Sequence, residues 1–373
     1  MNILPATHPL AAGRTASSAL VRALQGVRPD RLPVWFMRQA GRSLPEYRQL
    51  RAGTPMLDAC LDPEMAAEIT LQPVRRHGVD AAIFFSDIVI PLKLAGVEVD
   101  IVAGRGPVFP RPVRTAADVE RLCAEHPAES LRQAIAPIRE AVQRVTAELG
   151  ATPLIGFAGA PFTLAAYLVE GGPSRDHLRA RALMHTDPEA WKRLLAWAAE
   201  LSGVFLEAQV SAGASAAQLF DSWAGSLSAR DYTAHVSPSS MHTLERVRQL
   251  RWVDPASADG EEQPVPTIHF AVGADHLLED FARLGTNALG IDWRIPLDEA
   301  SARLGGGVPL QGNLNPAFLS APEQALEAHL REVIQAGRSA PAHVLNLGHG
   351  VPPETDPEVL SWLVQRAHAL GNI

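Results

Sequence analysis

Two arginines in the first part of the chain have the type and spacing expected of a carboxylate-binding site. Arg38 and Arg42 lie four residues apart, directly after the apolar run 33–37. If the chain turns helical there, both side chains project to the same side. Arginine suits carboxylates because its planar fork can donate two parallel hydrogen bonds. The residues between the two arginines are Gln39, Ala40 and Gly41. A glycine at this place permits close approach of a ligand to the backbone.

A structural role is the alternative for these arginines. Either of them could form an ion pair with Glu46 or Asp58, and surface pairs of this kind are common and carry little information. Turn chemistry, however, gives no reason for two arginines beside a glycine at the end of a buried run. We therefore predict that this segment binds carboxylate groups.

Asp87 is the second candidate, and its chemistry would be electrostatic. It follows the apolar run 81–85 and Ser86, so it should emerge from the core where that run ends. A carboxylate there could accept hydrogen bonds from ring N–H groups and stabilise a cationic intermediate. Nearby arginines would keep it ionised. The alternatives are that Asp87 caps a helix or pairs with Arg38, and the second of these is compatible with catalysis.

Three further polar residues follow apolar runs and could complete such a site. His349 lies between two glycines, where backbone freedom and close approach of a substrate are both useful. Tyr167 lies six residues beyond Pro161, in the first turns of an expected helix, and its hydroxyl could point into the site. Ser222 follows the run 216–220. Taken alone, Tyr167 and Ser222 are weak signals.

The elements that must position these residues are short apolar runs separated by longer amphipathic stretches. Such runs are typical of buried parallel strands. We predict eight strands, at 33–37, 81–85, 153–157, 216–220, 267–270, 288–291, 308–310 and 344–347. Repeated strand–helix units with eight strands predict a single (β/α)8 barrel of the TIM type. The residues after each strand would then share one rim, so we expect the active-site cleft at the C-terminal mouth of the strands.

The ends of the chain and one polar segment lie outside this pattern. Residues 1–14 lack a basic start followed by an apolar stretch, which argues against a signal peptide, and we expect a short, flexible, frayed arm there. Residues 15–373 are expected to form one catalytic domain. The segment 253–264 is polar, acidic and contains proline, so we predict a solvated surface loop.

The helix expected at 63–77 has a clear start. Asp62 can be its N-cap, Pro63 its first residue, and Glu64 suits the positive end of the helix dipole. Pro73 should kink this helix or end it early.

Composition excludes several classes of protein. The net charge of −8 without a basic tract argues against nucleic acid and anionic membranes as partners. No apolar run approaches the ~20 residues needed to cross a bilayer. Cys60 and Cys123 are far apart in sequence, which argues against a disulfide scaffold and fits a reducing cytoplasm. No HExxH, paired CxxC or cluster of His and Cys after the strands predicts a metal site.

Four segments of the sequence closely resemble the uroporphyrinogen decarboxylase family, and the similarity runs from about residue 26 to 370. The segments are PVWFMRQAGRSLPEYR (33–48), FSDIVIPL (85–92), GFAGAPFTLAAYLVEGG (156–172) and NLGHGVPPETDPE (346–358). The resemblance implies a distorted (β/α)8 barrel that forms a homodimer with facing clefts. It also implies loss of the four acetate carboxyl groups of uroporphyrinogen III as CO2, giving coproporphyrinogen III in haem biosynthesis, without a metal or organic cofactor.

Residue by residue, the resemblance implies roles for the candidates above. The family's binding loop corresponds to Arg38, Gln39, Ala40, Gly41 and Arg42, and its central aspartate to Asp87. Its tyrosine, its serine or threonine and its histidine correspond to Tyr167, Ser222 and His349. All nine would bind the substrate. Asp87, the two arginines, Tyr167 and His349 would act in catalysis. Ser43 departs from the family, which usually has tyrosine there, and puts local packing in doubt.

Two other functions use similar features. A zinc-dependent methyltransferase on a related barrel would need Cys and His ligands at the strand ends, which this sequence does not show. A tetrapyrrole carrier without turnover would keep the pocket, but the presence of Asp87 with both arginines argues against it.

Overall fold

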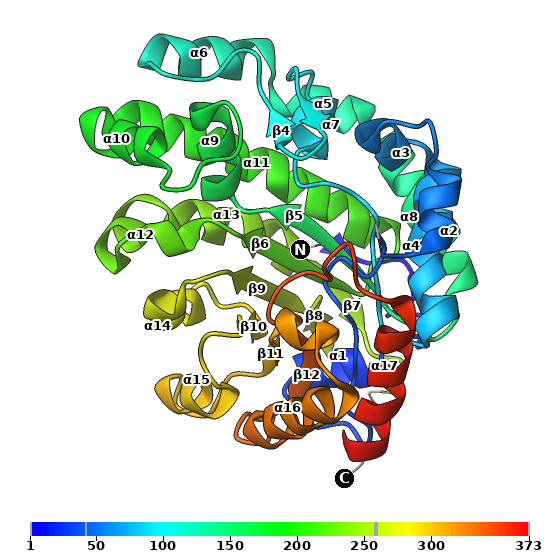
Figure 1. Ribbon diagram of the computed structural model, residues 1–373. Coiled ribbons are helices and arrows are strands. Elements are labelled where there is room, and N and C mark those ends of the chain that lie inside the picture. Colours follow the sequence, from blue (N-terminus) through cyan, green and yellow to red (C-terminus); the bar gives the residue numbers. More distant parts are fainter. Residues whose placement is uncertain (1, 42, 257–259, 372–373) are drawn as a thin grey trace.

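A curved sheet of seven parallel strands forms the centre of the molecule, and helices surround it (Figure 1). The computed structural model describes residues 2–41, 43–256 and 260–371. Neighbouring strands follow the order β12 (His343–Leu347), β11 (Leu310–Leu314), β10 (Ala288–Gly290), β9 (Thr267–Ala271), β6 (Ala216–Asp221), β5 (Leu154–Gly159) and β2 (Ala82–Ile83). The fold is therefore mixed α/β with a sheet curled into a half-barrel, as the buried apolar runs predicted in part.

The segments between the strands are mainly helical. In chain order they are α1 (Ala19–Leu24), α2 (Pro45–Leu50), α3 (Met56–Leu61), α4 (Pro63–His77), α5 (Ile90–Leu94), α6 (Ala116–Glu125), α7 (Ala128–Ala134), α8 (Ala136–Glu148), α9 (Pro161–Glu170), α10 (Leu178–Thr186), α11 (Pro188–Ala212), η1 (Ala224–Ser226), α12 (Ala229–His235), α13 (Ser237–Arg248), η2 (Asp275–Leu277), α14 (Leu278–Ala282), α15 (Leu297–Arg303), η3 (Pro316–Ser320), α16 (Glu323–Gly337) and α17 (Pro357–Gly371). Among the helices described, none is both long and apolar enough to span a membrane.

The first predicted strand, 33–37, is not a strand of the sheet. Val34 forms an isolated parallel bridge with Leu345 of β12, and its carbonyl accepts a hydrogen bond from the backbone of Asp80, just before β2. Trp35 still donates to the carbonyl of Leu345 in β12 at 3.2 Å, but the N–H groups of Phe36 and Met37 donate to the side chains of Gln39 and Asn346. Because side-chain amides replace ladder partners at the end of the run, it spans the gap between the two sheet edges without becoming an eighth strand.

The seventh strand begins later than its apolar residues suggested. We predicted 308–310, whereas β11 runs from Leu310 to Leu314 and therefore includes residues expected in the following loop. Their amides are satisfied inside the fold. Gln311 donates to the side chain of Gln218 at 3.1 Å, and Asn313 donates to the carbonyl of Asp292 at 2.8 Å.

A second, three-stranded sheet corrects two predictions about polar segments. It contains β1 (Asn2–Ile3), β7 (Leu250–Val253) and β8 (Glu262–Pro264). The expected frayed arm is packed, because β1 pairs with β7 and the side chain of Leu10 is fully buried. The expected loop 253–264 begins and ends in strands, and β7 and β8 pair antiparallel. Acidic residues are compatible with this hairpin because Glu262 is exposed. Residues 257–259 of that loop lie outside the described residues.

Helix α4 starts as predicted but does not end early. The carboxylate of Asp62 accepts from the N–H groups of Glu64 and Met65, both at 3.0 Å. The helix then continues past Pro73 to His77, where Gly78 ends it in a left-handed conformation. A short antiparallel hairpin, β3 (Asp100–Val102) with β4 (Gly106–Val108), follows α5.

Candidate active site

The loop after the run 33–37 is fixed by a buried glutamine. Gln39 accepts from the N–H of Phe36 at 2.9 Å and donates to the carbonyl of Ala81 at 3.0 Å. Its side chain is fully buried, so it holds the loop in place. Arg38 has φ 62°, in the left-handed region that residues other than glycine rarely adopt. Held in this conformation, the loop leaves Arg38 exposed, while Gly41 is buried.

The loop at Arg38 meets the loop after β12. The N–H of Val351 donates to the carbonyl of Met37 at 2.9 Å. A Cβ placed on Gly350 would lie 2.7 Å from Cγ of Arg38, closer than atoms can pack. Glycine is therefore required at position 350 for the aliphatic part of Arg38 to lie against this loop.

Arg38 carries an unneutralised charge in the part of the chain that the structure describes. The carboxylates proposed as its structural partners are engaged elsewhere: Glu46 pairs with Arg76 at 3.1 Å, and Asp58 approaches Lys93 at 4.0 Å. For Arg38, the alternative of a structural ion pair with either residue is thus contradicted. Its guanidinium is free to bind an anion.

Asp87 lies between β2 and α5, partly buried. Its Oδ1 accepts from the N–H of Val89 at 3.0 Å, which fixes the turn before α5. Burial raises the pKa of Asp87, and this effect exceeds the opposing effects of the Val89 N–H and the positive charge of Arg38. Arg38 thus favours the ionised form of Asp87, as expected, but burial is the larger effect on this pKa. No ion pair joins Asp87 to Arg38 among the described residues.

Tyr167 presents a neutral hydroxyl. It lies in α9, half-buried, and its ring packs against Trp223 with centroids 3.8 Å apart. Burial raises the pKa of Tyr167 to about 12; the negative charge of Asp87 adds to this effect and Arg38 opposes it. The hydroxyl thus remains a donor at neutral pH. Ser222, half-buried, directly precedes Trp223 at the end of β6.

His349 presents a neutral imidazole. Burial lowers its pKa, the positive charges of Arg38 and Arg294 lower it further, and Asp292 opposes them. Its ring meets the ring of Trp293 edge-on, with centroids 6.0 Å apart. Trp293 is held by Arg294, whose guanidinium lies 3.9 Å from the centroid of the indole and is paired with Asp292 at 2.8 Å.

The structure thus brings four of the predicted residues into one electrostatic neighbourhood. The charge of Arg38 acts on the pKa values of Asp87, Tyr167 and His349, although these residues come from four separate segments of the chain. Arg42 lies outside the described residues. What the arrangement can do chemically is bind an anion at Arg38 and favour a positive charge next to Asp87.

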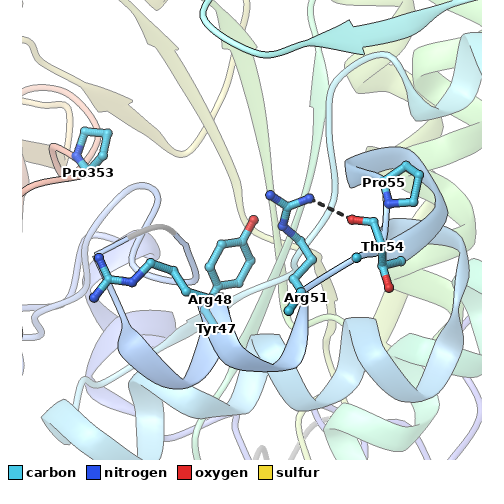
Figure 2. A pocket seen from close by; sticks show the side chains of 8 residues that line it. Tyr47, Arg48, Arg51, Thr54, Pro55 and Pro353 are labelled. Atoms are coloured by element: carbon cyan, nitrogen blue, oxygen red, sulfur yellow. Dashed lines mark hydrogen bonds between the residues drawn. The ribbon is translucent and has the colours of Figure 1, made fainter.

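A pocket of about 610 Å³ adds two arginines that the sequence did not single out (Figure 2). It is lined by Tyr47, Arg48, Arg51, Ala52, Gly53, Thr54, Pro55 and Pro353. Arg51 donates to the carbonyl of Thr54 at 3.0 Å and lies over the ring of Tyr47. Within the described residues, neither arginine forms an ion pair. The signal that could have found them is their three-residue spacing just after the first binding loop.

Arg51 of this pocket and Asp87 act on the same thiol. Burial raises the pKa of the Cys60 thiol well above its usual value; the negative charge of Asp87 adds to this shift, and the positive charge of Arg51 reduces it. Both charged groups are thus near the same buried thiol. A large anion in the pocket could reach the neighbourhood of Asp87.

Potential metal ligands gather elsewhere. Over the described residues, one group of histidine and acidic side chains could hold an ion, formed by His185, Asp231 and His235. It lies on α10 and α12, and none of the three is a residue of the predicted site. The ligands that a zinc-dependent methyltransferase would need at the strand ends are not present in the described part of the chain.

Comparisons with known proteins identify the family. The family model for uroporphyrinogen decarboxylase matches residues 15–370. A uroporphyrinogen decarboxylase of Leifsonia xyli subsp. xyli is 64% identical over 98% of each chain. Another, from Arthrobacter sp., is 61% identical over 96% of this chain and 99% of its own. Among solved structures, a methyltransferase from Methanosarcina mazei has a TM-score of 0.75 over 95% of this chain and 98% of its own, at 20% identity. That likeness concerns the fold alone.

Proposed function

The chain belongs to the uroporphyrinogen decarboxylase family and acts in porphyrin biosynthesis, and we propose that the cleft around Arg38 and Asp87 removes the four acetate carboxyl groups of uroporphyrinogen III. The observation that carries this proposal is one neighbourhood in which a partly buried carboxylate with a raised pKa lies near arginines without ion-pair partners. Such a site is matched to a ligand that has many negative groups at its edge and becomes positive at its centre.

The arginines bind the edge of the substrate. Arg38 and Arg42 hold substrate carboxylates through paired hydrogen bonds, with Gln39, Ala40 and Gly41 shaping the loop between them. Arg48 and Arg51 extend this cationic surface into the adjoining pocket. Hydrogen bonds to charged groups are each worth about 1.5–3 kcal/mol, so several of them together offset the desolvation of a polyanion.

The pyrrole ring accepts the electrons of the reaction. A proton adds to a ring carbon next to the acetate-bearing carbon and makes the ring cationic. The bond between the acetate methylene and its carboxylate then breaks, CO2 leaves, and the electron pair neutralises the ring. A proton adds to the methylene carbon and the first proton leaves, so each acetate consumes one proton and becomes a methyl group.

Asp87 stabilises the cationic ring. Burial disfavours its ionised form, and a positive ring beside it supplies a counter-charge. Its oxygens accept hydrogen bonds from the pyrrole N–H groups. The neutral hydroxyl of Tyr167, the neutral imidazole of His349 and the hydroxyl of Ser222 orient the substrate and handle protons, and His349 lies next to Arg38 across the contact at Gly350.

Three features of the working enzyme belong to the same proposal. Hydrogen bonds of residues 33–35 to both edges of the sheet support a closed (β/α)8 barrel. We expect a homodimer, measurable by light scattering as twice the chain mass of 40.0 kDa. We also expect the enzyme in the cytoplasm, which fractionation of cells with an antibody against the chain would test.

The decisive experiment supplies the reduced substrate. Full-length protein is incubated anaerobically with uroporphyrinogen III, the product is oxidised, and its carboxyl groups are counted by mass spectrometry together with the CO2 released. We expect stepwise loss of four carboxyl groups, ending at coproporphyrin. Tight binding without CO2 would identify a carrier and overturn the proposal. A control with oxidised uroporphyrin should release no CO2, because its conjugated ring cannot accept the proton in the same way.

A further inference from the structure

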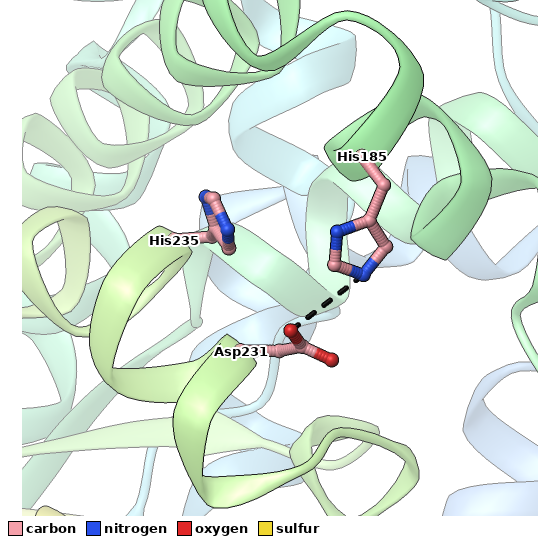
Figure 3. A group of neighbouring side chains, drawn as sticks. All are labelled: His185, Asp231 and His235. Atoms are coloured by element: carbon pink, nitrogen blue, oxygen red, sulfur yellow. Dashed lines mark ion pairs between the residues drawn. The ribbon is translucent and has the colours of Figure 1, made fainter.

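Two histidines and an aspartate converge between the helices α10 and α12 (Figure 3). His185 comes from the last turn of α10, whereas Asp231 and His235 both come from α12. One ligand atom of each lies within 4.8 Å of those of the other two. Nε2 of His185 is 3.6 Å from Oδ1 of Asp231, and the two imidazole rings meet edge-on with centroids 5.7 Å apart.

The backbone on which these ligands stand is already fixed. Asp231 and His235 are four residues apart on α12, so their side chains lie on one face of the helix. Ser228 caps the helix by accepting from the N–H of Asp231 at 3.1 Å. At its other end, the indole of Trp191 donates to the carbonyl of His235 at 3.2 Å. Only the side chains, of which His185 is exposed, must adjust to a ligand.

We propose that His185, Asp231 and His235 bind a divalent transition-metal cation, with Zn²⁺ as the reference ion. Two imidazole nitrogens and a carboxylate oxygen are a common zinc donor set, and a water molecule would complete a tetrahedron. With metal–ligand bonds of about 2.0–2.2 Å, ligand atoms lie about 3.3–3.5 Å apart. Rotation of the exposed His185 side chain closes the remaining gap. Mg²⁺ and Ca²⁺ are disfavoured, because they prefer six or more oxygen ligands.

A cation at this place would tie together two segments that also meet at the cleft. α10 follows His177, and α12 follows Trp223 and η1. The rings of His177 and Trp223 are 4.3 Å apart, and Nδ1 of His177 lies 3.1 Å from Oγ of Ser226. Trp223 in turn packs against Tyr167. The metal site therefore restrains the segment at Trp223 against which Tyr167 packs, and it takes no ligand from the reaction site.

The test is titration of tag-free, full-length protein with ZnCl2 by calorimetry. We expect one site, and His235→Ala should weaken its binding at least about 100-fold, since even the loss of a residue that only supports a ligand costs 10–100-fold. His185→Ala should do the same and leave folding intact, because that side chain is exposed. His242→Ala is the matched control: this exposed histidine also lies beside a carboxylate, 3.5 Å from Glu200, and its loss should leave the affinity unchanged.

A second readout identifies the coordination. Co²⁺ in place of Zn²⁺ should give the intense visible absorption of a tetrahedral site in the wild type and in His242→Ala, but not in His185→Ala or His235→Ala. Zinc affinity that is equal in all four proteins, or a spectrum that His242→Ala alone removes, would overturn the proposal. Because the readout is metal binding and not decarboxylation, failure here leaves the proposed function untouched.

Discussion

Replacement of Asp87 by asparagine separates catalysis from stability more cleanly than any other change in this chain. Asparagine has the same shape, and its oxygen can still accept the hydrogen bond from the N–H of Val89 that fixes the turn before α5. What disappears is the negative charge. Since the cleft holds that charge against the cost of burial, its removal should not weaken the fold.

Asp87→Asn should lower kcat, whereas it should not lower the free energy of unfolding. One preorganised electrostatic group is typically worth about 2.7–4 kcal/mol in the transition state, so kcat should fall about 10²–10³-fold. KM should change little, because the arginines bind the carboxylates. The pKa of Asp87 in the folded state is raised above its usual 3.8. At pH values between the unfolded and the folded pKa, the native state therefore binds more protons than the unfolded state. The wild type loses stability as the pH rises through this range. The asparagine variant lacks this loss.

The assay pairs single-turnover decarboxylation of uroporphyrinogen with urea unfolding at several pH values. The reasoning is refuted if Asp87→Asn keeps near-normal turnover, or if it loses turnover only in proportion to a loss of folded protein. A Tyr167→Phe variant is the useful comparison, because it removes a neutral hydroxyl from the same neighbourhood. Its effect should be smaller, about tenfold, as expected for one neutral hydrogen bond.

Three further outcomes follow from contacts in the structure. Arg51→Ala should raise KM for uroporphyrinogen about 10–100-fold through loss of a charge-assisted hydrogen bond. Arg139 is an exposed arginine without an ion pair, and Arg139→Ala should leave KM unchanged. Equal KM values for the two variants would show that the pocket does not bind the substrate. Gly350→Ala should displace Arg38 and raise KM with a small change in melting temperature, and unchanged kinetics would show that this contact does not position the guanidinium. Below pH 6.5 the chain should lose stability, because burial lowers the pKa of three histidines to about 4 and the unfolded state then binds more protons. Between pH 6.5 and 5 the loss is about 1.6 kcal/mol per histidine. Denaturant unfolding at the two pH values measures this loss, and a flat profile contradicts it. The three are His8, His77 and His343.

The sequence predicted most of the sheet because its strands carry their own signal. Runs such as 216–220 are apolar, short and flanked by breakers, and β6 occupies 216–221. The run 33–37 carries the same signal but behaves differently. The N–H groups of Phe36 and Met37 find acceptors on the side chains of Gln39 and Asn346, and Asn346 is more than 300 residues away in sequence. No local pattern shows which acceptor a backbone N–H will find, so the missing eighth strand could not be foreseen.

In the candidate site, too, some features follow from neighbouring residues in the sequence and others depend on residues far away in the chain. Residue types placed Arg38 and Asp87 after buried runs, and that placement was visible without coordinates. The direction of the pKa shift of Asp87 was not visible, because it depends on whether burial or the charge of Arg38 prevails. Arg48 and Arg51 were missed because they fall in and just after a helical segment, where arginines are usually solvated surface residues.

The pairing of arginines explains how an acidic protein can bind a polyanion. With a net charge of −8, the chain as a whole repels such a ligand, and many of its arginines are paired with carboxylates. Arg75 pairs with Glu68 and Glu148, and Arg246 pairs with Glu200 and Glu207. Arg38, Arg48 and Arg51 have no such partner among the described residues, a property they share with other arginines such as Arg139. What distinguishes the three is their position, because Arg48 and Arg51 line one pocket and the charge of Arg38 acts on Asp87.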